Sequence, residues 1–86
     1  MNDATARDMT RKLERLSDAL VNFKGAHLAG AGGAELEKLA DAVCDAHAAY
    51  ADAYVQLSAE DQRTMDARAA GRDAGVEQSL PEAFRP

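Results

Sequence analysis

The chain of 86 residues has no tryptophan and no isoleucine, and it contains two prolines and a single cysteine, Cys44. One thiol cannot close an intrachain disulfide, which excludes a disulfide-supported fold and favours a reducing compartment. No apolar run approaches the roughly 20 residues that a membrane-spanning helix needs, and the N-terminal segment lacks the apolar stretch of a secretory signal. We therefore expect a cytoplasmic protein that does not enter a membrane.

Large hydrophobic side chains are scarce, although hydrophobic residues make up 47% of the sequence. Twenty of these residues are alanines, and aromatic residues amount to only 5% of the chain. Apolar burial stabilises by roughly 25 cal/mol per Å², so small side chains contribute little, and a lone two-helix hairpin of this composition would be marginal. We expect the core to be completed by the C-terminal segment, by a second copy of the chain or by another partner.

The net charge of −5 is unevenly distributed. Residues 1–33 carry five basic and four acidic side chains, whereas residues 34–57 carry one basic and five acidic side chains. Proteins that grip a nucleic-acid backbone usually present a basic face. The acidic balance of this chain therefore disfavours direct binding of nucleic acid.

Two apolar stripes, each stepping by three or four residues, dominate what is present. They comprise Met9, Leu13, Leu16, Leu20, Phe23 and His27, and then Leu36, Leu39, Val43, Ala46, Tyr50, Ala53 and Leu57. Such steps place side chains on one face of an α-helix, and the glycines of residues 30–33 separate the two stripes. The sequence predicts an antiparallel helical hairpin. Its first helix is capped by Asp3 or Thr5. It ends either at Gly25 or near Leu28, with Gly30 in the left-handed position, and the apolar position of His27 favours the later end. Gly33 caps the second helix.

A third helix is predicted after Ser58, which together with Asp61 resembles a capping box. This helix should be short, extending to about Ala70, because Gly71 and Gly75 follow. Its sequence is too polar for a central core element.

The predicted domain organisation is a helical domain at residues 1–74 and a C-terminal tail at residues 75–86. Two apolar residues of the tail, Leu80 and Phe84, are expected either to dock on the bundle or to reach a partner.

The second helix has a broader apolar face than the first, because a row of alanines runs beside its main stripe. Rows of small residues let helices approach closely, so we expect the chain to form a homodimer, with the two hairpins making a four-helix bundle. The predicted dimer or partner contact consists of Ala42, Ala46, Ala49, Ala53, Tyr50 and Tyr54. The tyrosine pair also fits core packing with the hydroxyls reaching solvent.

Candidate chemistry is sparse. Cys44 and His47 are three residues apart on the second helix, but a zinc site needs three or four ligands, so we expect no metal. The two histidines are expected at the edge of the bundle, and the thiol on the flank of the apolar face. The glycine cluster has neither the preceding strand nor the lysine of a phosphate-binding loop. Without a nucleophile and base in a recognisable pattern, we expect no enzyme and no cofactor.

Two functions remain open. The first is a non-enzymatic protein-interaction module, an adaptor or regulator that binds a protein partner through its helical surfaces. The second is an acidic inhibitor that mimics nucleic acid and occupies a basic groove on a target protein. In that case an acidic face of Asp41, Asp45 and Asp52 would present the carboxylates.

Overall fold

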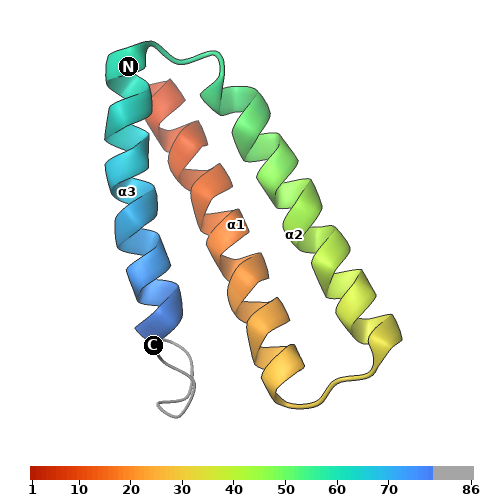
Figure 1. Ribbon diagram of the computed structural model, residues 1–86. Coiled ribbons are helices and arrows are strands. Elements are labelled where there is room, and N and C mark those ends of the chain that lie inside the picture. The colour runs from red at the N-terminus through yellow and green to blue at the C-terminus, as the bar shows by residue number, and fades with distance from the viewer. Residues whose placement is uncertain (79–86) are drawn as a thin grey trace.

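The computed structural model describes the backbone of residues 1–78 and the side chains of residues 1–72, and it contains three helices (Figure 1). The helices are α1 (Asp3–Leu28), α2 (Gly33–Tyr54) and α3 (Ala59–Gln78). Helix α1 lies in the middle and packs against both other helices, with α2 antiparallel to it and α3 parallel (Figure 1). The predicted all-α fold with a hairpin of the first two helices is confirmed.

The turn between α1 and α2 depends on one glycine. Gly30 has a φ of 80°, in the left-handed region that side-chain-bearing residues avoid. The backbone N–H of Ala31 donates to the carbonyl of Ala26 at 3.0 Å, and that of Gly30 donates to the carbonyl of His27 at 3.2 Å. This pair of hydrogen bonds is a Schellman motif, and it confirms the predicted helix end near Leu28.

The caps of the first two helices differ from prediction by one to three residues. The N-cap of α1 is Asn2, whose side chain accepts a hydrogen bond from the backbone N–H of Thr5 at 2.8 Å, so neither Asp3 nor Thr5 is the cap. Asparagine is as good an N-cap as aspartate, and its position one residue earlier adds length to the helix. The N-cap of α2 is Gly32 rather than Gly33, and it offers no side-chain hydrogen bond.

Helix α3 begins where predicted but is longer than predicted. The Ser58 hydroxyl oxygen accepts from the backbone N–H of Asp61 at 3.2 Å, which caps the helix. The helix then continues through Gly71 and Gly75 to Gln78, so the prediction of a short third helix is wrong. Each helical glycine costs roughly 1 kcal/mol. Beyond Gly71, the side chain of Arg72 pairs with Glu14 of α1 at 2.9 Å.

The extension of α3 carries helix past the domain boundary predicted at residues 74–75. The remainder of the predicted tail, including Leu80 and Phe84, lies outside the described residues.

The core lies at one end of the bundle, where the start of α1, the end of α2 and the start of α3 meet; we call this the closed end. Met9, Leu13 and Met65 are 1%, 5% and 0% exposed and form one cluster. Partly buried residues pack around this cluster, namely Tyr50, Ala53, Tyr54, Leu57 and Ala69. The expectation that the third helix is too polar for the core is therefore wrong: one unbranched, adaptable methionine is enough to close it.

The other end of the hairpin, residues 16–43 around the glycine turn, is here called the loop end. Its large apolar residues are all only partly buried, namely Leu16, Leu20, Val21, Phe23, Leu28, Leu36, Leu39 and Val43. Helices α2 and α3 diverge towards this end, so α1 and α2 cover one another there largely without α3 (Figure 1). The hairpin thus has a closed core at one end and incompletely covered apolar side chains at the other.

Candidate interaction surface

An open groove runs between α1 and α2 and is the leading candidate for a binding surface. It encloses about 430 Å³. Small or apolar side chains from both helices form its floor, namely Ala19, Leu39 and Ala42, and polar or charged residues of α1 form one rim, namely Arg11, Glu14, Arg15, Asp18 and Asn22. We call it the hairpin groove. An apolar floor with a charged rim is the usual composition of a protein-binding patch.

Two rows of opposite charge accompany the hairpin. The arginine row is Arg7, Arg11 and Arg15 on α1, and the aspartate row is Asp41, Asp45 and Asp52 on α2; all six side chains are exposed. Within the described residues, ion pairs join Lys12 to Asp8, Arg72 to Glu14 and the N-terminal ammonium to Asp61. None of those pairs involves either row. Both rows are therefore available to a partner.

The predicted alanine contact is divided between the core and the surface. Ala46 is 1% exposed, because α1 covers it, and it is not available to a partner in this conformation. Ala53 packs against the core cluster at the closed end, whereas Ala42 is exposed on the floor of the hairpin groove. Ala49 is partly buried. Of the predicted row, Ala42 is thus the member best placed to touch another molecule.

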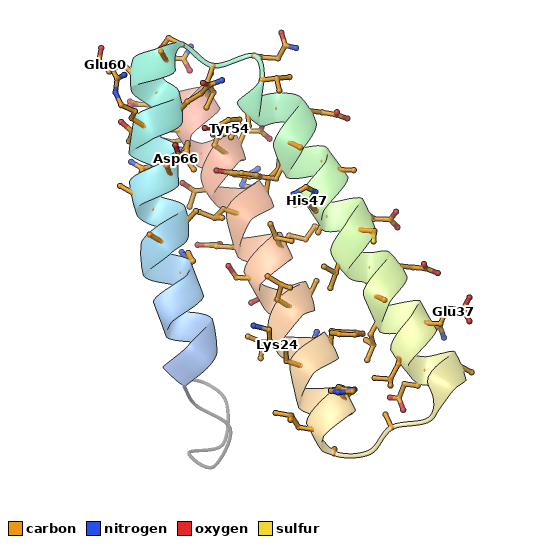
Figure 2. All side chains as sticks on the ribbon, viewed as in Figure 1. Lys24, Glu37, His47, Tyr54, Glu60 and Asp66 are labelled. Carbon is orange, nitrogen blue, oxygen red and sulfur yellow. The ribbon has the colours of Figure 1, made fainter. Side chains whose placement is uncertain are left out.

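The two tyrosines pack on the chain's own core, and their hydroxyls have different environments. The ring centroids of Tyr50 and Tyr54 are 6.0 Å apart. The Tyr54 hydroxyl donates to the Asp66 carboxylate at 2.9 Å, and the two residues face one another between α2 and α3 (Figure 2). The Tyr50 hydroxyl is buried and has no hydrogen-bond partner among the described residues, so the expectation that it reaches solvent is wrong. Core packing of the pair is confirmed, and a role in partner contact stays a prediction.

Both tyrosines have a raised pKa. Burial raises the pKa of Tyr50 above its ordinary value of 10.0, and the negative charge of Asp66 adds to the effect. For Tyr54, the hydrogen bond to Asp66 is the main cause, because that bond requires the phenolic proton. Neither shift brings a phenol towards neutral pH, where it would serve as a base.

The candidate metal ligands lie on the surface. Cys44 and His47 are exposed, and so is His27, whose ring stacks on Phe23 with centroids 6.3 Å apart. The thiol is therefore not the buried core residue that a free cysteine often is. Among the described residues, no group of three or more histidine, cysteine or carboxylate side chains lies close enough to hold a metal ion.

A second groove, between α1 and α3, was not apparent from the sequence. It is lined by Thr10, Leu13, Arg68, Gly71 and Arg72. Arg68 donates to the Thr10 hydroxyl at 3.4 Å, and Arg72 donates to Glu14 at 2.9 Å. These arginines connect α3 to α1. The polar sequence of α3 has no apolar periodicity that would have predicted which face meets α1.

Comparisons with protein-family models, with curated proteins and with solved structures give no match to this chain. No helix among the described residues is long and apolar enough to cross a membrane.

Proposed function

We propose that this chain is a non-enzymatic protein-interaction module of the cytoplasm that self-associates through the α1–α2 hairpin, two hairpins forming a four-helix bundle. The observation that carries the proposal is the state of the loop end. Eight large apolar side chains lie there on two helices, and each of them keeps part of its surface in water. Covering that surface would stabilise the chain, at roughly 25 cal/mol per Å² of apolar area removed from water.

The dimensions of the hairpin suit this role. Helix α1 has 26 residues and α2 has 22, which at about 1.5 Å per residue gives rods of roughly 39 and 33 Å. A stable interface buries about 800 Å² on each partner, and one long face of such a hairpin supplies an area of that order. The exposed thiol of Cys44 adds a reason to place the chain in a reducing compartment.

The test is the solution mass, measured by light scattering or sedimentation over a wide concentration range. The proposal predicts a reversible increase from monomer to dimer. Leu39→Glu, which puts a charge on the groove floor, should return the mass to that of a monomer. Ala67→Glu, at an exposed position on α3, is the control and should dimerise like the original chain. A helical monomer at all concentrations would contradict self-association.

A second candidate function is mimicry of nucleic acid, and the aspartate row favours it. Three exposed carboxylates, which make no ion pair with the side chains that the structure describes, follow one flank of α2, as phosphates follow a backbone. A basic groove on a target protein would bind such a row with a strong dependence on salt.

Mimicry is tested by the salt concentration that elutes the chain from an immobilised basic DNA-binding protein. The triple change of Asp41, Asp45 and Asp52 to Asn should abolish retention. The matched control changes three other exposed carboxylates, those of Glu35, Glu37 and Glu60, to amides, and so has the same net charge as the triple Asn variant. Equal losses in the two variants would show a response to net charge alone and would reject mimicry by this face.

A further inference from the structure

Two members of the arginine row line the hairpin groove, and helical spacing places the aspartate row on the flank of α2 beyond the groove. Arg11 and Arg15 line the groove on the α1 side. On α2, Ala42 lies on the groove floor, and Ala46 beyond it is buried against α1. At about 100° per residue, Ala46 and Asp45 lie on opposite sides of Ala42 around the helix. Ala46 faces α1, so Asp45 lies towards the outer side of α2. The α1 border of the groove thus carries Arg11 and Arg15 together with Glu14 and Asp18, and the aspartate row follows the outer flank of α2.

The two rows also lie at overlapping heights along the hairpin. Ala19 and Asn22 line the same groove as Leu39 and Ala42, which fixes how α1 and α2 are aligned. Since the helices are antiparallel, Arg15 then lies near the height of Ala46 and Arg11 near that of Tyr50. The aspartate row, from Asp41 to Asp52, spans these heights on α2.

From these positions we infer that a second copy of the chain docks on the hairpin groove about a two-fold axis parallel to the helices, with the arginine row of each copy against the aspartate row of the other. This inference rests on the proposed self-association and names its surface and partner. An axis parallel to the helices keeps each residue at its own height and places α1 of one copy opposite α2 of the other. An axis across the helices would instead place arginine on arginine.

Charge complementarity selects a second copy over other occupants. Each row is the complement of the other, so an isologous dimer satisfies both rows at once. Nucleic acid attracted by the arginine row would be repelled by the aspartate row beside it. Of the acidic residues on the arginine border, Glu14 is already paired with Arg72. Asp18 lies one turn beyond Arg15, at a height between Asp41 and Asp45, so it reduces the complementarity at that end of the row. The small floor residue Ala42 lets the two hairpins approach closely.

Two charge-reversal variants test the inference. The first changes Arg7, Arg11 and Arg15 to Glu, and the second changes Asp41, Asp45 and Asp52 to Lys. Alone, each variant brings like charges together in its homodimer, and its dissociation constant should rise about a hundredfold or more. Mixed in equal amounts, the two variants should form a heterodimer, because acidic rows of one then meet basic rows of the other at both contacts. Native mass spectrometry or light scattering reads the outcome.

The control reverses three exposed charges away from the groove, Glu37→Lys, Glu60→Lys and Arg63→Glu, and should dimerise like the original chain. Circular dichroism confirms that every variant is helical. If the original chain dimerises and both reversals leave the dissociation constant unchanged, or the mixture fails to form a heterodimer, the inference is wrong while the proposed self-association stands. If the original chain is monomeric throughout, both fail together.

Discussion

The closed end and the loop end of the hairpin are built from the same two helices, yet only one of them has a finished core. Met9 and Leu13 of α1 are buried at the closed end, whereas Leu16 and Leu20, the next members of the same stripe, are only partly buried. The difference is α3, whose Met65 is 0% exposed and fills the space beside Met9. A stripe of equal hydrophobicity is therefore buried to different degrees according to how many helices surround it.

This contrast assigns different roles to the two ends. The closed end contains the buried cluster of Met9, Leu13 and Met65 and holds α1, α2 and α3 together, whereas the loop end leaves apolar surface incompletely covered. Binding surfaces are commonly drawn from the less stable part of a fold, because they must leave contacts unmade in the free protein. Of the apolar residues at the loop end, Ala19, Leu39 and Ala42 line the hairpin groove.

The largest expected effect is the removal of the side chain that closes the core. Met65→Ala should lower the free energy of unfolding by about 2–5 kcal/mol, because it deletes a fully buried side chain and leaves a cavity. Leu36→Ala at the loop end should cost about 1 kcal/mol, since that leucine is only partly buried. Urea denaturation at equal protein concentrations measures both. Met65→Leu, expected to cost less than about 1.5 kcal/mol, keeps the test readable if the alanine variant does not fold. Equal costs for Met65→Ala and Leu36→Ala would show that the two ends do not differ.

Enlarging an alanine should separate core from surface within one row. Ala46→Leu forces a large side chain into a site that is 1% exposed and should destabilise the chain by about 1–3 kcal/mol. Ala42→Leu, at an exposed position four residues earlier, should change the free energy of unfolding by less than about 0.5 kcal/mol. Thermal unfolding of the two variants gives the comparison. A large loss of stability in Ala42→Leu would mean that this residue is part of the monomer core.

The hairpin could be predicted from the sequence because its signals are local and periodic. The stripe from Met9 to Phe23 has the helical step, and Gly30 supplies the backbone conformation that ends the helix. The serine cap at Ser58 was equally visible, since the cap and the N–H that it binds are three residues apart.

What could not be predicted depends on contacts between distant residues. The sequence around Gly71 does not indicate that α3 continues. A residue just beyond it, Arg72, pairs with Glu14 of α1, and this contact is distant in sequence. The sequence also could not predict which alanines of the row are buried. Ala42 and Ala46 have the same side chain, and only the packing of the helices distinguishes them. The residues that line the groove depend on the same packing of α1 against α2. The sequence therefore identified the candidate residues, but not which of them are in the core and which are on the surface.

A smaller effect distinguishes the two tyrosines at the closed end. Tyr54→Phe removes a hydroxyl that donates to Asp66 and should lower stability. Tyr50→Phe removes a buried hydroxyl that has no partner, so stability should stay the same or rise. The urea midpoints of the two variants, compared with that of the original chain, should therefore move in different directions. A loss in Tyr50→Phe as large as that in Tyr54→Phe would show that the Tyr50 hydroxyl also makes a stabilising contact.

The smallest expected effect is a decline of stability in alkali that originates at the closed end. The pKa of Tyr50 and of Tyr54 is raised above 10.0 in the folded chain, by burial in the first case and by the hydrogen bond to Asp66 in the second. Above pH 10 the unfolded chain therefore loses these protons first, so the stabilisation is complete below that pH and decreases as the pH rises through the folded values. Urea midpoints measured at rising alkaline pH should fall in the original chain and fall less steeply when both tyrosines are phenylalanine. An identical decline in the two proteins would assign it to other groups, such as the lysines, and would remove the closed end as its source.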